Sequence, residues 1–136
     1  MIPAALVAAL AITRLGAIHA AVFGGFAASS LAQRIEAGQP KAVMTASCGI
    51  EGKKGPIEYK LLVEDAISKS SFKPERVIVW QREELRWSPI REDRGQRDWR
   101  RLVDDAKRRG LRADAVPVRS DEGLYIIYTS GRLYVT

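Results

Sequence analysis

The chain has 136 residues, of which 46% are hydrophobic and 28% charged, and its formal net charge is +6. This length and composition predict about one globular domain with a core of its own and exclude a disordered tail. Cys48 is the one cysteine, which excludes a disulfide-stapled secreted domain and agrees with a reducing, intracellular setting. His19 is the one histidine, which excludes a zinc site of the usual Cys and His spacing.

The first segment, residues 2–12, is apolar, and the first charge, Arg14, follows it. A secretory signal carries its positive charge before the apolar run, and a run this short cannot span a bilayer. A mitochondrial presequence stays open as an alternative, because no acidic residue precedes Glu36. The preferred interpretation is a helix that begins at Pro3 and ends at Gly16, apolar nearly all round and therefore buried. Its apolar surface comprises Leu6, Val7, Leu10 and Ile12.

Downstream, strand-like and helix-like patterns alternate along the chain. Strands are predicted at residues 18–23, 41–46, 76–80 and 124–128, and helices at residues 28–37, 57–68 and 98–109. Gly38 and Gly110 are predicted to end two of these helices, and Asp98 to cap the last one. Leu61, Leu62, Ala66 and Ile67 are expected to face inward from the helix at 57–68. Because each strand is nearly continuous in apolar residues, the sequence predicts an α/β fold whose mostly parallel sheet has helices on both faces.

Ligands in such folds bind at the carboxyl ends of strands, so the loops that follow the strands are the candidate sites. The turn Phe23-Gly24-Gly25 lacks a Cβ at two positions and lets a ligand approach the backbone, although a plain turn explains it as well. Lys53 and Lys54 stand between glycines in the loop at residues 49–55. Their ammonium groups suit a phosphate, and a solvated surface loop is the alternative.

The last strand is followed at once by Thr129-Ser130-Gly131. Two hydroxyl groups and free backbone N–H groups beyond a strand that we expect to be buried are suited to a nucleotide phosphate.

The motifs at residues 1–3, 14–19, 22–26 and 125–131 resemble, in order and spacing, the N-terminal domain of acetyl-CoA and propionyl-CoA synthetases. These enzymes belong to the AMP-forming acyl-CoA synthetase superfamily. The segment at residues 46–51 favours the propionyl-CoA branch. The resemblance implies that residues 1–131 are part of the large AMP-binding N-terminal domain and that residues 132–136 are a divergent tail.

Members of this family use ATP and Mg²⁺ to activate a short carboxylate as an acyl-adenylate, release pyrophosphate, and transfer the acyl group to coenzyme A. The resemblance implies that two loops contact the nucleotide part of coenzyme A and that a third is the start of the ATP phosphate-binding loop. The coenzyme A residues implied are Phe23, Gly24, Gly25, Lys53 and Lys54, and the phosphate-loop residues are Thr129, Ser130 and Gly131.

After Gly131 the sequence leaves the family pattern, because Arg132-Leu133-Tyr134 stand where glycines and a lysine would face the phosphates. We therefore predict a fragment of a short-chain acyl-CoA synthetase that is inactive alone, with no catalytic residue and no metal ligand. ATP, Mg²⁺ and coenzyme A are expected to serve the parent enzyme and not to bind this chain tightly. A non-catalytic module that binds coenzyme A or a protein is the alternative. The parent enzyme is expected to bind no membrane. It is expected to be intracellular, either in the cytosol or in the mitochondrial matrix.

Residues 82–112 are rich in arginine, and the three tryptophans, at positions 80, 87 and 99, lie in or near this segment. Basic residues interleaved with aromatics are typical of nucleic-acid binding. Acidic residues interrupt the run throughout, however, and the helix at 98–109 carries an apolar face with Trp99, Leu102, Val103 and Ala106. We therefore predict a solvated helix and no nucleic-acid partner. His19 is expected to be a hydrogen-bonded core residue, and Cys48 a small buried or loop residue.

Overall fold

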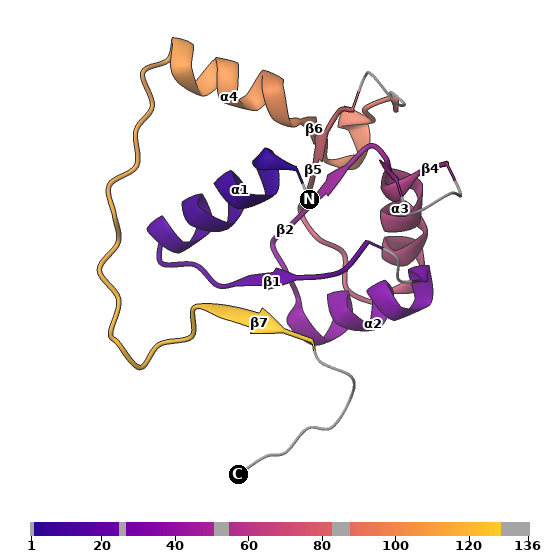
Figure 1. Ribbon diagram of the computed structural model, residues 1–136, viewed down its shortest axis with the longest axis horizontal. Helices are drawn as coiled ribbons and strands as arrows, with labels where there is room; N and C mark the ends of the chain where they lie inside the picture. The colour runs from indigo at the N-terminus through magenta and orange to yellow at the C-terminus, as the bar shows by residue number, and fades with distance from the viewer. Residues whose placement is uncertain (1, 25–26, 51–54, 83–87, 129–136) are drawn as a thin grey trace. The chain divides into compact units, whose positions relative to one another are not determined.

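The structure is a computed structural model that describes residues 2–24, 27–50, 55–82 and 88–128 (Figure 1). The chain divides into two compact units. One unit is Gly24–Leu111, and the other joins the two flanking segments, Met1–Phe23 and Arg112–Thr136. Each unit contains a parallel β-sheet and at least one helix, so the predicted α/β class is confirmed. The parallel strands form two separate sheets instead of the single sheet that we expected.

The flanking unit consists of helix α1 (Pro3–Arg14) and strands β1 (His19–Ala21) and β7 (Tyr125–Ile127). The helix begins at the predicted proline, and Gly16 takes a φ of +65° just beyond its end, as the sequence predicted. The two strands pair in parallel and lie side by side in Figure 1. Both are shorter than the apolar runs that contain them, because each strand extends only as far as its partner.

The apolar side chains of this unit are much more exposed than the sequence predicted. In α1 only Ala4 and Ala8 are buried, whereas Leu6 and Leu10 are 60% and 63% exposed. Strand β7 is exposed along its whole length, so the expectation of a buried last strand is wrong. A two-stranded sheet offers little cover to either face. Apolar periodicity shows which face of a segment can be buried, and neighbouring elements decide whether it is.

The sheet of the central unit contains β2 (Ala42–Ala46), β5 (Arg76–Trp80) and β6 (Gln96–Asp98), in the order β2-β5-β6 and all parallel. Strands β2 and β5 appear where the sequence predicted them. Strand β6 was not predicted, because it is three residues long and entirely polar. Its backbone pairing with β5 makes it a strand.

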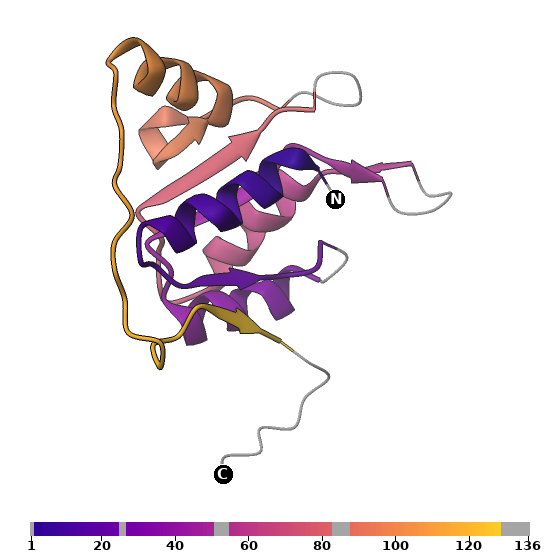
Figure 2. The ribbon, with the colours of Figure 1, turned by 60° about the vertical axis from the view of Figure 1, so that its left-hand side comes forward.

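Helices cover both faces of this sheet, as predicted. Helices α2 (Ala28–Gly38) and α3 (Tyr59–Lys69) pack against each other, and Val63 of α3 forms a buried cluster with Val77 and Val79 of β5. Side chains alternate along a strand, so Trp80 lies on the opposite face. There its ring meets that of Trp99, at the start of α4 (Trp99–Arg108), at a centroid distance of 6.1 Å. Figure 2 shows α3 and α4 on either side of β5.

Three details of these helices differ from the predictions. Leu61 of α3 is 47% exposed and does not face the core, whereas Lys60 is buried in its place. Leu102 of α4 is 40% exposed, and no residue of that helix is fully buried. At the end of α2, Gly38 is still helical, and Gln39 takes the left-handed conformation with φ +41°.

The cap of α4 gives a testable prediction. Asp98 accepts a hydrogen bond from the backbone N–H of Arg101 at 3.0 Å, as the sequence predicted for the N-cap. We expect Asp98→Ala to lower the free energy of unfolding by about 1 kcal/mol, because one N–H of the first turn loses its partner. Urea denaturation measures this loss. The control, Asp104→Ala, removes a carboxylate from the same helix without touching the cap, and equal losses in the two variants would contradict the prediction.

The segment at residues 49–55, predicted as a loop, begins with strand β3 (Gly49–Ile50), which pairs in an antiparallel manner with β4 (Pro56–Ile57) just beyond the segment. A 3₁₀ helix, η1 (Glu92–Arg94), precedes β6. None of the helices in the described ranges has the length and apolar character that a membrane crossing requires.

Candidate functional site

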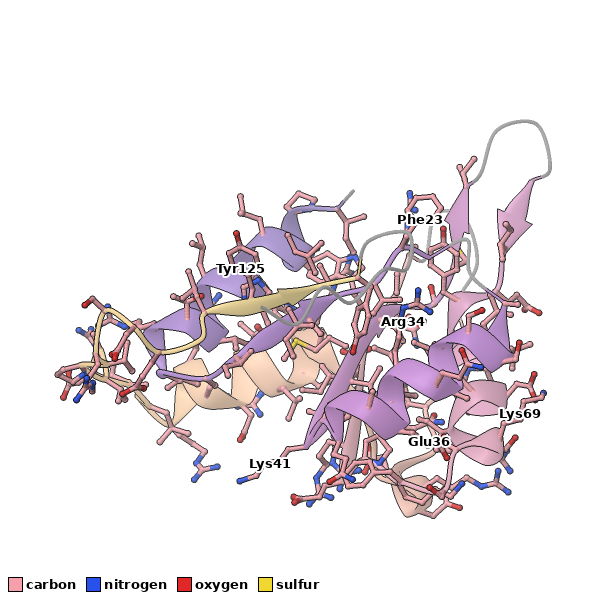
Figure 3. The ribbon with its side chains drawn as sticks, turned by 90° about the horizontal axis from the view of Figure 1, so that it is seen from below. Phe23, Arg34, Glu36, Lys41, Lys69 and Tyr125 are labelled. Carbon is pink, nitrogen blue, oxygen red and sulfur yellow. The ribbon has the colours of Figure 1, made fainter. Side chains whose placement is uncertain are left out.

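Two of the three candidate loops leave from the same end of the β1-β7 pair. The parallel register places Ala21, the last residue of β1, opposite Ile127, the last residue of β7. Phe23 follows β1 closely and is 72% exposed, and Tyr128 follows β7 directly. Figure 3 shows Phe23 beyond the end of β1 and Tyr125 on β7. The Phe-Gly-Gly turn and the Thr-Ser-Gly segment therefore both begin at the carboxyl edge where a parallel sheet presents ligands.

The first and second candidate loops converge on Tyr59, the first residue of α3. A Cβ placed on Gly24 would lie 2.7 Å from Cζ and 2.9 Å from Oη of this ring. A Cβ on Gly49 would meet the same atoms at still shorter distances. Both separations are shorter than real Cβ contacts, so a side chain at either position would require the Tyr59 ring to shift. The Tyr59 ring occupies the space that the missing Cβ atoms leave.

The structure therefore joins the start of the Phe-Gly-Gly turn to the start of the basic loop. Phe23 and Gly24 are the predicted site residues that it describes. The other predicted site residues, which are Gly25, Lys53, Lys54, Thr129, Ser130 and Gly131, lie outside the described residues. Their roles stay predictions.

Sequence analysis did not identify Tyr59 as part of the site. An aromatic residue at the start of a helix is most often a core residue, and nothing in its local pattern indicates contact with two loops. The available signal was indirect. The sequence predicted a close approach, by a ligand, only at the Gly24-Gly25 turn, and Gly49 was noted only as one of the glycines around Lys53 and Lys54.

The chain just before Gly49 is buried and held by backbone bonds. Ser47 follows β2 and is 1% exposed. Its N–H donates to the carbonyl oxygen of Trp80 at 2.9 Å, and its Oγ accepts from the N–H of Arg82 at 2.9 Å. Cys48 is completely buried, as the sequence predicted. These contacts connect the ends of β2 and β5 and hold in place the residues from which β3 begins.

Close to these residues, Lys60, Glu64 and Gln96 form a network around the buried Lys60 side chain. The Lys60 ammonium donates to Glu64 Oε1 at 2.9 Å, and its side chain is only 3% exposed. Gln96 of β6 also donates to Glu64 Oε1 and accepts from the N–H of Arg91 at 2.9 Å. Burial raises the pKa of Glu64, but the hydrogen bonds from Lys60 and Gln96 outweigh it and hold this pKa below its usual value. The carboxylate is therefore ionised and partnered near neutral pH.

The lowered pKa of Glu64 makes stability depend on pH. A carboxyl group whose folded pKa is depressed stabilises the folded state above its unfolded pKa, near 4.5, and that contribution is lost as the pH falls through the folded pKa. We expect the difference in free energy of unfolding between the native chain and Glu64→Gln to shrink from about pH 7 to about pH 3. Urea denaturation across this range measures it. A difference that stays constant or grows on acidification would contradict the assignment.

His19 does not have the predicted environment. Its Nδ1 atom is buried and has no hydrogen-bond partner among the residues that the structure describes. The register of the pair places Tyr125 directly across from it, with ring centroids 5.9 Å apart and planes tilted by 39°. The prediction of a hydrogen-bonded core histidine is thus wrong for this atom, because the neighbouring strand presents an aromatic ring to the imidazole.

The basic helix α4 forms a shallow groove with the end of β5. The Arg100 guanidinium lies over the Trp80 ring at 5.2 Å, and Asp104 and Lys107 also line the groove. The mixture of charges agrees with the predicted solvated face. Across the described ranges, no three His, Cys, Asp or Glu side chains gather closely enough to bind a metal ion.

Comparisons with known proteins match almost the whole chain. The family model described as AMP-binding enzyme matches residues 1–131. The mitochondrial acyl-CoA synthetase short-chain family member 3 of Rattus norvegicus is 43% identical over 132 residues, which cover 96% of this chain and 18% of the relative. The mitochondrial member B of Dictyostelium discoideum is also 43% identical, over 96% of this chain and 19% of its own length.

The acetyl-coenzyme A synthetase of Leptospira biflexa is 38% identical, and the match covers 96% of this chain and 20% of the relative. The chain thus spans about a fifth of the length of these curated relatives. The family model covers far more than half of the chain, and the α/β fold agrees with it. The chain belongs to the family of AMP-binding enzymes, and the relatives that it matches include short-chain acyl-CoA synthetases.

Proposed function

We propose that this chain is part of the large domain of a short-chain acyl-CoA synthetase. In this reaction a carboxylate oxygen attacks the α-phosphate of ATP, which gives an acyl-adenylate and pyrophosphate. The thiol of coenzyme A then attacks the acyl carbonyl, and AMP leaves. The names of the relatives, which are acyl-CoA and acetyl-CoA synthetases, support this assignment. ATP, its Mg²⁺ ion and coenzyme A are then substrates of the whole enzyme.

The observation that carries the proposal is the parallel register of β1 and β7. It brings the start of the Phe-Gly-Gly turn and the start of the Thr-Ser-Gly segment to one edge of a sheet. In the proposed role, Phe23, Gly24 and Gly25 approach the nucleotide of coenzyme A, and Thr129, Ser130 and Gly131 approach the phosphates of ATP. Lys53 and Lys54 would offset the phosphate charge of coenzyme A, because two ammonium groups attract a polyanion.

Residues 1–131 would form the AMP-binding part and residues 132–136 a divergent tail. Arg132, Leu133 and Tyr134 supply neither the glycine backbone nor the lysine that a phosphate cradle needs. The chain alone is therefore proposed to lack adenylation activity and to have no catalytic residue or metal ligand. Propionate or acetate is proposed as the acid, and the mitochondrial matrix or the cytosol as the compartment.

Pyrophosphate exchange tests the proposed inactivity. We expect the purified chain to incorporate no labelled pyrophosphate into ATP with propionate or acetate and Mg²⁺, because the phosphate cradle is incomplete. Exchange above a control without protein would overturn this part of the proposal. An acetyl-CoA synthetase assayed in parallel shows that the conditions support exchange.

A module that binds coenzyme A without catalysis is the second candidate. The observation in its favour is that Gly24 and Gly49, which begin two of the candidate loops, meet at one side chain within a unit that has its own core. A cooperative thermal transition that moves upward with added coenzyme A would support the module. An unchanged transition would exclude coenzyme A binding by the isolated chain.

A further inference from the structure

The Tyr59 ring lies beside Gly24 and Gly49, and the proposed reaction gives this ring no role. Its Cε2, Cζ and Oη atoms are the nearest neighbours of both Gly24 and Gly49. Gly24 lies shortly before α2, Gly49 begins β3, and Tyr59 begins α3. One aromatic ring therefore connects three elements of the central unit at a single point.

The backbone under this ring is joined to neighbouring elements of the central unit. The N–H of Lys60 donates to the carbonyl oxygen of Ser47 at 3.4 Å, so the first turn of α3 is bonded to the segment that leads into β3. Lys60 itself is anchored by its buried ion pair with Glu64. Val63, one turn later, belongs to the core cluster with Val77 and Val79. The Tyr59 ring thus projects from a rigid base.

We propose that Tyr59 is a positioning residue that sets the separation between Gly24 and Gly49, the described residues from which the Phe-Gly-Gly turn and the basic loop continue. The outer edge of one ring is the nearest side-chain group to the Cβ positions of both Gly24 and Gly49, so the two loop starts pack against the same side chain. The ligand consequence rests on the proposed function. Loop starts that are already held in place lose less conformational freedom when coenzyme A binds, which favours affinity.

The test compares Tyr59→Phe, Tyr59→Leu and Tyr59→Ala with the control Leu61→Ala in the full 136-residue chain. Leu61 lies on the same helix, is 47% exposed, and has no atom among the three nearest to the Cβ position of either glycine. Hydrogen exchange, read by mass spectrometry on the peptides that contain Gly24 and Gly49, reports how firmly both loop starts are held. Calorimetric titration with coenzyme A reports the affinity, and urea denaturation reports the folded fraction.

We expect Tyr59→Leu and Tyr59→Ala to speed exchange in both peptides together by about fivefold or more, and Tyr59→Phe and Leu61→Ala to leave it unchanged. Coenzyme A affinity should fall about tenfold in the first two variants and stay within about twofold in the others. Tyr59→Leu keeps an apolar side chain, so the comparison stands if the alanine variant does not fold.

Two results would overturn the role of Tyr59. One is exchange that changes in neither peptide or in only one of them. The other is unaltered affinity for coenzyme A in a folded Tyr59→Leu variant. If the native chain binds no coenzyme A, the proposed ligand site fails, and the exchange data then decide by themselves whether Tyr59 holds the two loops.

Discussion

Replacement of Glu64 by alanine will lower the free energy of unfolding by about 3 kcal/mol, because it leaves the Lys60 ammonium buried without its ionic partner. The Lys60 side chain is only 3% exposed, whereas that of Glu64 is 27% exposed, so water would have to enter from the Glu64 side to replace the lost carboxylate. Gln96 would lose its acceptor at the same time. Urea denaturation at neutral pH measures the loss.

Asp65→Ala is the matched control for this variant. Asp65 also pairs with a lysine four residues along the same helix, but both partners of that pair are 49% exposed. Exposed pairs of this kind contribute less than about 1 kcal/mol, so the control should change stability little. Glu64→Ala combined with Lys60→Met should recover part of the loss, since it removes the buried charge. A loss no larger in Glu64→Ala than in Asp65→Ala would contradict the buried network.

Replacement of Gly95 by alanine will cost about 3 kcal/mol in the free energy of unfolding, the sum of an unfavourable conformation and a backbone clash. Gly95 has a φ of +74°, and a Cβ there would lie 2.8 Å from the carbonyl oxygen of Glu75. The residue ends η1 and leads into β6, and its own carbonyl accepts from the N–H of Val77 at 3.1 Å. A shift to relieve the clash would therefore disturb the pairing of β5 with β6.

Gly110 separates the two contributions. Its φ is +62°, but no atom lies within 4 Å of the place where its Cβ would be. Gly110→Ala should therefore cost about 1 kcal/mol, the conformational part alone. Equal losses in the two alanine variants, measured by urea denaturation, would show that the contact with Glu75 does not constrain Gly95.

Local patterns in the sequence predicted those elements whose stability comes from their own residues. The run Arg76–Trp80 is rich in β-branched side chains and forms β5, and Asp98 caps α4 as its residue type indicates. Strand β6 has no such pattern. Its residues are polar, and it is a strand because β5 lies beside it. The pairing of β6 with β5 therefore cannot be predicted from the three polar residues of β6 alone.

The candidate site follows the same division. The Gly24-Gly25 turn was predicted to let a ligand approach the backbone, and what the structure places near Gly24, and near Gly49 as well, is the Tyr59 side chain. The partner could not be predicted, because Tyr59 reaches them only through the packing of α3 against the sheet and α2. Lys60 shows the opposite error. A lysine within an apolar pattern is expected on the surface, and the ion pair with Glu64 allows it to be buried.

The pairing of β1 with β7 also constrains the order of folding. His19 pairs with Tyr125, and the whole central unit lies between them in the chain. During synthesis, β1 leaves the ribosome long before its partner exists, whereas Gly24–Leu111 can collapse as soon as it has emerged. The long loop between β1 and β7 costs more conformational entropy to close than the shorter loops between contacts within the central unit. We therefore expect the edge from which the two candidate loops leave to form after the central unit has folded.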